Sequence, residues 1–509
     1  MPSLQGRRLV VVSNRLPIVL KEEDGHWSMQ KGSGGLVTAL SPILKNRGGL
    51  WVGWTGTTET LPIRQIKRIL GPFSRASGFR LLPVFISEAE RDLFYLGMSN
   101  EVIWPLFHDL QTRCNFDPRY WDAYLGVNRK FARAVQRHME PGDFTWVHDY
   151  HLIPLAGLLN RQGFEGNCAF FLHIPFPPPD IFAKLPWRTE LLHALLHYEF
   201  VGFQTPRDRR NFSDCLRMFF PETKVEGRGP IVRIRSANRE ILAGALPISV
   251  DALEFIKLSR SGEVAERTSA IRADYRERQI IFGADRLDYT KGIPEKLKAF
   301  RHLLKVHPEF RGQVVLVQLL IPSRQEVPAY RQLKEEIDRL VGEINGEFSA
   351  GDWTPVVYRY QTMDRPELIA HYRAADVGFV TPLKDGMNLV SKEYVLSQAD
   401  NRGVLVLSEF AGSASQLGES SILVNPYSVK DVAAGLVRAL GMKPEEKKRR
   451  LENMRRTLRR HDVFWWVDNF LRASTGRDLK DFPERDLAPL VGRHRVDPFL
   501  PPISQGRTG

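Results

Sequence analysis

Short apolar runs alternate with amphipathic stretches along almost the whole chain, and this alternation restricts the fold more than any other feature of the sequence. In the first half, β-branched and aromatic runs bounded by polar residues predict buried strands, and helical periodicity between them predicts helices. The predicted strands are Leu9–Val12, Thr145–Val147, Ala169–Ile174 and Phe200–Phe203, and the predicted helices include Tyr120–His138 and Thr189–His197.

The same alternation returns in the second half. Strands are predicted at Ile280–Gly283, Val314–Ile321, Val356–Tyr360, Val377–Val380, Val404–Leu407 and Ile422–Val424. Strands that alternate with helices form parallel sheets with helices on both faces. The sequence therefore predicts an α/β fold with two parallel, doubly wound, Rossmann-like domains whose strand ends face a central cleft.

The join between the two halves is predicted at Leu246–Val250, where a strand pattern meets a proline and a new helical pattern begins. Helical sequence from Glu445 to Thr475 closes the folded part of the chain. The stretch 481–509 is rich in Pro, Gly and Arg, a composition that is typical of a flexible tail.

Composition excludes several other classes of protein. The chain has 509 residues, 43% of them hydrophobic and 26% charged, which excludes intrinsic disorder, collagen and a disulfide miniprotein. The three cysteines, Cys114, Cys168 and Cys215, form no CxxC pair, which indicates reduced thiols. Because no run of ~20 apolar residues and no secretory leader is found, we expect a soluble, cytoplasmic protein.

The chain carries 72 Lys and Arg against 59 Asp and Glu, which gives a net charge of +13. This excess permits a nucleic acid, an acidic membrane or an anionic metabolite as the partner. The densest basic clusters are Lys447–Arg450, Arg455–Arg456 and Arg459–Arg460, all in one helical stretch. Because no aromatic residues are interleaved with them, they are typical of a solvated helix face rather than of an RNA-binding surface.

Arg286 and Lys291 directly follow the predicted strand Ile280–Gly283. An arginine fork and a lysine point charge at one strand end suit a diphosphate that gains negative charge as a bond to it breaks. The alternative is that Arg286 pairs with Asp285 or Asp288 on the surface. The spacing alone leaves both interpretations open.

The segment Thr381–Tyr394 places a glycine between a predicted strand and a helix that starts at about Asn388. Helix N-termini carry free N–H groups that bind phosphate, so the N–H groups of Met387–Val390 are candidate phosphate ligands. Glu393, about one turn into the helix, could reach ribose hydroxyls. The alternative is an ordinary helix cap in which Asp385 is the N-terminal carboxylate.

A glycine-rich turn, Lys31–Leu36, precedes a helical pattern, and Arg15 ends the first predicted strand. Paired glycines let the backbone approach a sugar or an anion closely, and Arg15 could hold the phosphate of such a ligand. An ordinary turn is the alternative, because glycine-rich loops are common in turns.

Three histidines lie near strand ends in the first half, His148, His151 and His173. A metal site is disfavoured, because the HxxH pair straddles a strand-to-helix corner and no Cys or Glu completes a ligand set. Asp149 and His173 are interpreted as polar groups for sugar hydroxyls, with structural hydrogen bonds as the alternative. The chain also has no DxD motif that could hold a metal-bound nucleotide diphosphate.

Together these segments resemble the trehalose-6-phosphate synthases, which are retaining glycosyltransferases of GT-B architecture. The resemblance runs from about Leu9 to Leu471 and rests on the order and joint presence of many motifs. They are SNRLP, GGL, WVGWTG, the segment Tyr95–His108, WVHDYHL, FFLHIPFP, GFQT, ADRLDYTKG, IPSR and PLKDGMNLVSKEY. The resemblance implies an acceptor-side domain at 1–247, a nucleotide-sugar-binding domain at 248–461, and a C-terminal helix at about 462–477 that packs back on the first domain.

The resemblance also implies two substrate sites. The donor site would comprise Gly34, Gly35, Arg286, Lys291, Asp385, Gly386, Met387, Asn388, Leu389, Val390 and Glu393, and the acceptor site Arg15, Trp54, Tyr95, Trp104, Asp149 and Arg324. The implied catalytic residues are Arg286, Lys291, His173 and Asp149. Arg286 and Lys291 would hold the donor diphosphate, His173 and Asp385 would contact the transferred glucose, and Arg15 and Arg324 would clamp the acceptor phosphate.

The implied reaction moves glucose from UDP-glucose, or from ADP- or GDP-glucose, to glucose 6-phosphate and gives α,α-trehalose 6-phosphate with retention. It would proceed by front-face substitution, with no metal and no other cofactor. Its partners would be these small molecules rather than a nucleic acid or a membrane, and a homo-oligomer stays open. The alternatives are a glucosylglycerol-phosphate synthase that uses glycerol 3-phosphate, a relative that joins cyclitols, and a non-catalytic regulatory or nucleic-acid-binding relative.

Overall fold

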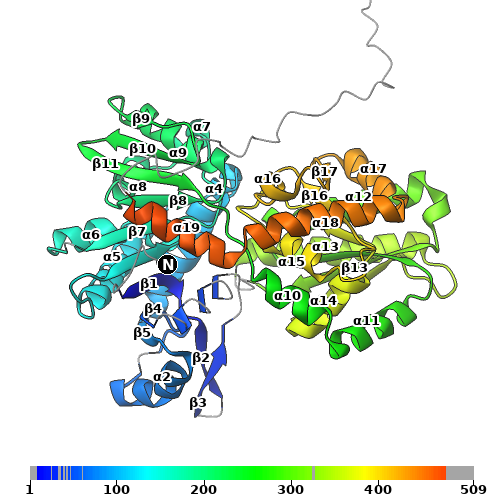
Figure 1. The fold of residues 1–509 in the computed structure, drawn as a ribbon, viewed down its shortest axis with the longest axis horizontal. Helices are drawn as coiled ribbons and strands as arrows, with labels where there is room; N and C mark the ends of the chain where they lie inside the picture. The colour runs from blue at the N-terminus through cyan, green and yellow to red at the C-terminus, as the bar shows by residue number, and fades with distance from the viewer. Residues whose placement is uncertain are drawn as a thin grey trace, which may run out of the picture.

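Two β-sheets, one in each half of the chain, organise the structure (Figure 1). The computed structural model describes residues 8–23, 26–32, 36–37, 40–41, 44–45, 48–59, 61–164, 166–323 and 327–476. The predicted tail at 481–509 lies outside these residues. None of the helices described is long and apolar enough to cross a membrane.

The first half forms a nine-stranded sheet in the order β5-β4-β1-β6-β7-β8-β11-β10-β9. Its strands are β1 (Leu9–Arg15), β4 (Leu50–Trp54), β5 (Arg80–Val84), β6 (Phe144–His148), β7 (Asn167–Phe171), β8 (Phe200–Phe203), β9 (Lys224–Glu226), β10 (Ile231–Ser236) and β11 (Arg239–Ala245). A separate hairpin pairs β2 (Ile18–Glu23) with β3 (His26–Lys31).

Helices connect these strands. They are α2 (Ile63–Ser77), α3 (Glu88–Glu90), the π-helix η1 (Arg91–Ile103), α4 (Trp104–Phe107), α5 (Pro118–Gln136), α6 (Leu155–Arg161), α7 (Pro179–Phe182), α8 (Arg188–Leu195) and α9 (Pro206–Phe219). Short 3₁₀ turns lie at η2 (Gln111–Arg113) and η3 (Tyr150–Leu152).

Continuous apolar sequence explains the central strands. β1 lies between β4 and β6, parallel to both, and its residues from Leu9 to Asn14 are all buried. Strands covered on both faces are apolar throughout, so the strands predicted at β1, β6 and β8 are confirmed. The strand predicted at Ala169–Ile174 ends at Phe171, which leaves His173 in the loop that follows.

One edge of this sheet departs from the prediction of a wholly parallel sheet. β10 pairs antiparallel with both β9 and β11. Ala237 and Asn238 form the turn between β10 and β11, with positive φ angles of 46° and 59°. Two such residues make the tight turn whose twist suits an antiparallel hairpin. The parallel prediction is wrong at this edge because the chain returns through hairpins rather than through helices.

The second half forms a six-stranded parallel sheet in the order β14-β13-β12-β15-β16-β17. Its strands are β12 (Gln279–Arg286), β13 (Val314–Ile321), β14 (Val356–Tyr360), β15 (Val377–Val380), β16 (Val404–Ser408) and β17 (Ile422–Val424). The helices are α10 (Ala252–Ser259), α11 (Gly262–Asp274), α12 (Ile293–Val306), α13 (Pro328–Phe348), α14 (Arg365–Ala374), α15 (Leu389–Ser397), α16 (Ala414–Leu417), α17 (Val429–Leu440), α18 (Pro444–Arg460) and α19 (Val463–Thr475), with 3₁₀ turns at η4 (Tyr289–Lys291) and η5 (Pro308–Phe310).

Side chains of β13 alternate between two apolar clusters, one on each face of the second sheet. Val314, Leu316 and Leu320 belong to one cluster, and Val315, Val317 and Leu319 to the other. On one face α12 packs against α13 and α17, and on the other α14 packs against α10, α11 and α15. Helices therefore cover both faces, as predicted for a doubly wound sheet.

The chain passes between the halves at 246–250 and again at 461–463. The N–H of Val463 donates to the carbonyl of Val250 at 3.2 Å, so the two crossings are hydrogen-bonded to each other. α18 packs on the second half, whereas α19 contacts β8 and β11 of the first sheet (Figure 1). Phe470 of α19 stacks on Trp146, with ring centroids 4.1 Å apart. The last helix is thus anchored in the core of the first half.

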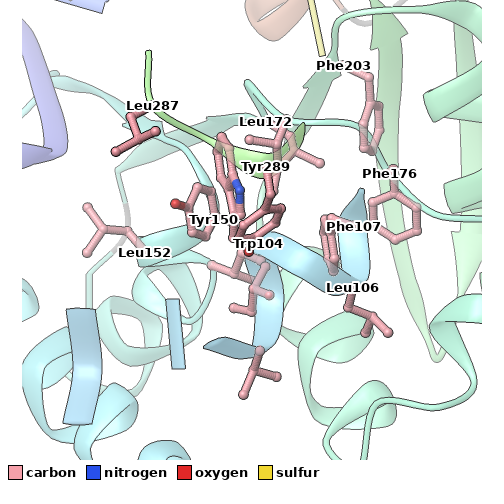
Figure 2. Packing of buried hydrophobic residues seen from close by; sticks show 14 of the residues in the cluster. Trp104, Leu106, Phe107, Tyr150, Leu152, Leu172, Phe176, Phe203, Leu287 and Tyr289 are labelled. Carbon is pink, nitrogen blue, oxygen red and sulfur yellow. The ribbon is translucent and has the colours of Figure 1, made fainter. Parts of the chain in front are cut away.

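An apolar core also connects the two halves. Figure 2 shows Leu287 and Tyr289, which follow β12, beside Trp104 and Tyr150 of the first half. Arg113 adds a cation–π contact 4.8 Å from the ring of Tyr289. These contacts hold the strand ends of the second sheet against α4 and η3 of the first half, and the residues expected to bind substrate lie around them.

Candidate functional site

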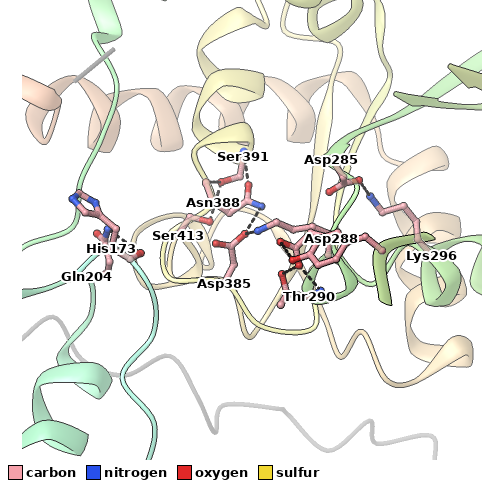
Figure 3. A network of polar contacts seen from close by, with 12 residues as sticks. His173, Gln204, Asp285, Asp288, Thr290, Lys296, Asp385, Asn388, Ser391 and Ser413 are labelled. Atoms are coloured by element: carbon pink, nitrogen blue, oxygen red, sulfur yellow. Dashed lines mark hydrogen bonds and ion pairs between the residues drawn. The ribbon is translucent and has the colours of Figure 1, made fainter. Parts of the chain in front are cut away.

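Lys291 and Asp385 form a buried ion pair at the strand ends of the second sheet. The Lys291 Nζ lies 2.5 Å from Asp385 Oδ2, and the two side chains are 9% and 15% exposed. Asn388 Nδ2 donates to the same carboxylate oxygen at 3.2 Å (Figure 3). Burial opposes ionisation of Asp385, but the Lys291 ammonium holds the pKa of that carboxyl below its usual value. Lys291 is therefore fixed in place beside the Asp385 carboxylate.

Arg286 ends β12 and is exposed. Its guanidinium lies 5.8 Å from the ring of Trp104 in the first half. Within the described part of the chain it forms no ion pair with either neighbouring aspartate. Asp285 forms a buried pair with Lys296 at 2.6 Å, and Asp288 accepts from Thr290 N–H. The alternative interpretation, a surface ion pair of Arg286 with Asp285 or Asp288, is therefore wrong. Arg286 instead faces the junction of the two halves.

Asn388 caps α15, and the alternative with Asp385 as the cap is wrong. Asn388 has a φ angle of 71°, and its side-chain oxygen accepts from the N–H of Ser391 at 3.1 Å. Leu389 and Val390 are the first residues of the helix, so their N–H groups have no partner within it. These N–H groups meet the requirement for binding phosphate at a helix N-terminus.

Glu393, the expected ribose ligand, lies one turn further along α15. It accepts a hydrogen bond from the hydroxyl of Tyr372 at 3.1 Å. Burial raises the pKa of Glu393 above its usual value. The structure places this carboxyl in the same helix as the Asn388 cap, and its role toward ribose stays a prediction.

At Gly386 a loop of the second half lies directly against a loop of the first. A Cβ atom at Gly386 would overlap the carbonyl oxygen of His173. Only glycine therefore lets the loop after β15 pass directly against the loop after β7. The next residue, Met387, is buried. This contact brings Asp385 and His173 into one region, in agreement with what the resemblance implies for these two residues.

His173 and Asp149 lie together after β7 and β6. Asp149 has a φ angle of 71°, which is uncommon for a residue other than glycine, and its Oδ1 accepts from the N–H of His173 at 3.2 Å. His173 Nε2 lies 3.1 Å from Nδ1 of His148. Burial lowers the pKa of His173 to about 3, so its imidazole is neutral near pH 7.

A metal site around these histidines was disfavoured from the sequence. In the part of the chain that the structure describes, no group of three or more His, Cys, Asp or Glu side chains could hold a metal ion. His151 instead stacks on Tyr150, with ring centroids 3.9 Å apart, and on Tyr95. Its ring belongs to an aromatic cluster of the first half.

A second cationic site is built around Arg15 at the end of β1. The Arg15 guanidinium lies 3.8 Å from the ring of Trp54 and 5.3 Å from that of Tyr95. Burial lowers the pKa of Arg15, and among the described residues no carboxylate pairs with it. A desolvated cation without a counter-ion favours an anionic ligand. Three of the expected acceptor residues therefore come together.

Trp104 links the residues around Arg286 and Lys291 to the aromatic residues around Arg15. It is 5% exposed, lies near Arg286, and its ring lies 5.9 Å from that of Tyr150 in a tilted arrangement. Its carbonyl is 2.7 Å from Nδ1 of His108, whose ring is 4.3 Å from the Trp104 ring. Burial lowers the pKa of His108 to about 4, and Lys291 and Asp385 act on it electrostatically.

His108 was missed as a site residue by reasoning from the sequence. The signal available was its place four residues after Trp104 in a helical motif, which puts both residues on one side of α4. Gly34, Gly35 and Arg324, which the sequence also assigned to the sites, lie outside the described residues.

Comparison with known proteins identifies the family to which the chain belongs. A model of glycosyltransferase family 20 matches residues 7–475. A Dictyostelium discoideum protein described as alpha,alpha-trehalose-phosphate synthase (UDP-forming) A is 37% identical over 468 residues, which are 91% of this chain and 62% of that protein. The chain thus spans less than two thirds of the length of that relative.

Two solved structures match almost over their full length. A Burkholderia xenovorans alpha,alpha-trehalose-phosphate synthase (UDP-forming) in complex with glucose-6-phosphate is 34% identical, with a TM-score of 0.83, covering 92% of this chain and 100% of that one. An E. coli structure bound with UDP-2-fluoro glucose is 35% identical, with a TM-score of 0.83, covering 92% and 99%. The predicted GT-B architecture is confirmed by these matches.

The family match runs through both sheets and both crossings of the chain. It includes Arg15 at the end of β1, Arg286 at the end of β12 and the loop after β15 that carries Asp385. A match over so much of the chain, with related structures of the same fold, shows that this chain belongs to glycosyltransferase family 20.

Proposed function

We propose that this protein is a retaining glucosyltransferase that moves glucose from UDP-glucose to glucose 6-phosphate and releases α,α-trehalose 6-phosphate and UDP. One observation carries the proposal: Arg286 and Lys291 supply positive charge from the second half, and Arg15 supplies a separate, partly buried cation from the first. Two anionic substrates need two such groups. Support also comes from relatives described as UDP-forming, in complex with glucose-6-phosphate, or bound with UDP-2-fluoro glucose.

The donor diphosphate would bind between Arg286, Lys291 and the N-terminus of α15. Negative charge grows on this diphosphate as the bond to glucose breaks, and fixed positive groups stabilise that charge without reorganising. Lys291 is already held by Asp385 at 2.5 Å, so its ammonium is oriented before substrate arrives. These groups would take the place of a divalent cation, and we propose that no metal is required.

The transferred glucose would lie beside His173, Asp149 and Asp385. Retaining glycosidases use one of two carboxylates about 5 Å apart as a nucleophile. Here Asp385 is paired with Lys291, and Asp149 accepts the N–H of His173, so both carboxylates are engaged as positioning groups. This favours front-face substitution, in which the departing phosphate oxygen accepts the proton of the attacking hydroxyl.

The acceptor phosphate would bind at Arg15. A guanidinium that packs against Trp54 and Tyr95 has lost part of its hydration, and a phosphate dianion restores the missing interactions. Trp104 would close the sugar pocket toward Arg286, and Arg324 is proposed as the second phosphate ligand. The acceptor is thus recognised by its charge at one end and by aromatic surface along its ring.

The test is identification of the product. The purified chain is incubated with UDP-, ADP- or GDP-glucose and with either glucose 6-phosphate or glycerol 3-phosphate, in buffer with EDTA, and the products are assigned by NMR. The proposal expects α,α-trehalose 6-phosphate from UDP-glucose and glucose 6-phosphate. Glucosylglycerol phosphate as the main product would establish the alternative acceptor, and no transfer with any pair would support the non-catalytic alternative.

A further inference from the structure

We propose that His148 is a positioning residue that fixes which ring nitrogen of His173 carries the proton, so that His173 offers Nδ1–H to the bound sugar. The role in turnover rests on the proposed function, but the protonation pattern itself is a property of the free protein. His148 is the last residue of β6 and is fully buried, whereas His173 in the neighbouring loop is partly exposed. The nitrogen that a ligand can reach therefore belongs to His173.

The two rings are joined by one hydrogen bond, in which either ring could be the donor. His148 Nδ1 and His173 Nε2 are 3.1 Å apart. Burial lowers the pKa of both imidazoles, that of His173 to about 3, so both rings are neutral near pH 7. A neutral imidazole carries a proton on only one nitrogen. Either His148 donates and His173 keeps its proton on Nδ1, or His173 donates and its Nδ1 is a bare acceptor.

The surroundings of His148 decide between these two arrangements. If His173 donated, His148 would carry its own proton on Nε2, which is buried and has no partner among the described residues. A buried N–H group without an acceptor is rare in proteins, and it is rarer than a buried acceptor without a donor. If His148 donates instead, the same Nε2 is a bare lone pair.

The neighbouring tryptophans strengthen this preference. The ring of Trp146 lies 4.6 Å from that of His148, and the ring of Trp466 lies 6.4 Å from it. Within the described residues, the indole N–H groups of both tryptophans are buried without an acceptor. A proton on His148 Nε2 would add a third such donor to this aromatic pocket, whereas a bare lone pair there adds none.

The consequence is a defined polarity at the sugar site. With His148 as donor, His173 is an Nδ1–H tautomer and can donate to a sugar hydroxyl oxygen or ring oxygen. An imidazole in solvent can carry its proton on either nitrogen. His148 would therefore determine which nitrogen of His173 is the donor. Asp149 fixes the backbone of His173, and His148 fixes its ring.

Nitrogen NMR of the full-length protein tests the tautomer directly. Long-range ¹H–¹⁵N correlation spectra of histidine-labelled protein at pH 7.5 distinguish protonated from bare ring nitrogens, and a His173→Gln variant assigns the His173 signals. We expect His173 to be protonated on Nδ1. The inference is overturned if His173 is protonated on Nε2 in the unmodified protein, and this result does not depend on any enzymatic activity.

A matched pair of variants then tests the cause. In His148→Asn, the amide N–H can replace the Nδ1–H donor, and in His148→Leu a side chain of similar shape cannot. We expect His173 to keep the Nδ1–H form in His148→Asn and to lose it in His148→Leu. With substrates, kcat should be about tenfold or more lower for Leu than for Asn at similar KM for glucose 6-phosphate.

The outcomes separate this inference from the proposed function. The Nδ1–H form in His148→Leu would overturn the inference whatever the activity. Circular dichroism and urea unfolding of both variants show whether the fold is retained. Both variants remove the imidazole of His148, so a difference between them reflects the N–H donor and not the loss of the ring. If no glucosyl transfer occurs with the unmodified protein, the proposed function fails, while the NMR result still decides the tautomer of His173.

Discussion

The side-chain nitrogen of Lys384 lies 2.6 Å from a carboxylate oxygen of Asp109, and this ion pair joins the second half of the protein to the first. Lys384 precedes Asp385 in the loop after β15, and Asp109 follows α4, the short helix that begins with Trp104. The pair therefore connects the loop that carries Asp385 to the segment that carries Trp104.

We expect Lys384→Met to lower kcat/KM about tenfold while changing the free energy of unfolding by less than ~1 kcal/mol, because a partly exposed ion pair adds little stability but aligns two groups. The matched control is Arg373→Met, since Arg373 pairs with Asp400 within the second half at similar exposure. Initial rates and urea unfolding of both variants check this. Equal loss of activity in the two would rule out a role specific to the junction.

Replacing Lys291 with Met should affect both stability and turnover. It leaves the Asp385 carboxylate buried without its ammonium partner, which should cost about 3 kcal/mol of unfolding free energy. Turnover should fall about 100-fold, because one fixed positive group is lost from the leaving diphosphate. The double variant Lys291→Met with Asp385→Asn should regain stability but not kcat. Recovery of kcat in the double variant would show that Lys291 acts only through the fold.

Stability should fall in acid partly through His108. Its pKa is lowered from 6.5 to about 4 in the folded protein, so the unfolded chain takes up this proton first as the pH falls. The contribution of neutral His108 to the free energy of unfolding is fully present above pH 6.5 and is lost between pH 6.5 and pH 4.

The variant His108→Asn keeps an N–H donor for the carbonyl of Trp104 but does not titrate. Between pH 7 and pH 4 the unmodified protein should lose about 3 kcal/mol more unfolding free energy than this variant. Urea unfolding at a series of pH values measures the difference. Parallel stability curves for the two proteins would mean that the pKa of His108 is not lowered by folding.

Gly386→Ala should disrupt the contact between the two halves. Its Cβ would overlap the carbonyl oxygen of His173, so the loop after β15 must move, and we expect turnover to fall at least about tenfold. Gly346→Ala is the control, because nothing lies within 4 Å of its Cβ in α13. That change should raise stability by about 0.5–1 kcal/mol and leave turnover intact. Similar kinetics for the two variants would contradict the close approach at Gly386.

Much of the fold could be predicted from the chain because its signals are local. β1 and β12 are continuous apolar runs that end in polar residues, and this pattern marks a buried parallel strand whatever surrounds it. The edge strands β9 to β11 were not recognised as antiparallel, since their pairing depends on a turn with positive φ angles at Ala237 and Asn238. Neither residue is glycine, so the turn carries only a weak signal.

The site was predictable to the extent that strand ends determine it. Lys291 and Asp385 both follow neighbouring strands of one parallel sheet, so their ion pair agrees with that topology. The ion pair between Lys384 and Asp109 joins residues 275 positions apart, and no local sequence pattern predicts it. The tautomer of His173 depends on the burial of His148 by Trp466 from the last helix, which only the folded protein reveals.

The most direct test is the separation of the two anion sites by calorimetry. UDP and glucose 6-phosphate are titrated separately into the unmodified protein, Arg286→Ala and Arg15→Ala. The account predicts that Arg286→Ala weakens UDP binding about tenfold or more and leaves glucose 6-phosphate binding unchanged, and that Arg15→Ala does the reverse. Weaker binding of the same ligand in both variants, or unchanged binding of both ligands in both variants, would contradict it.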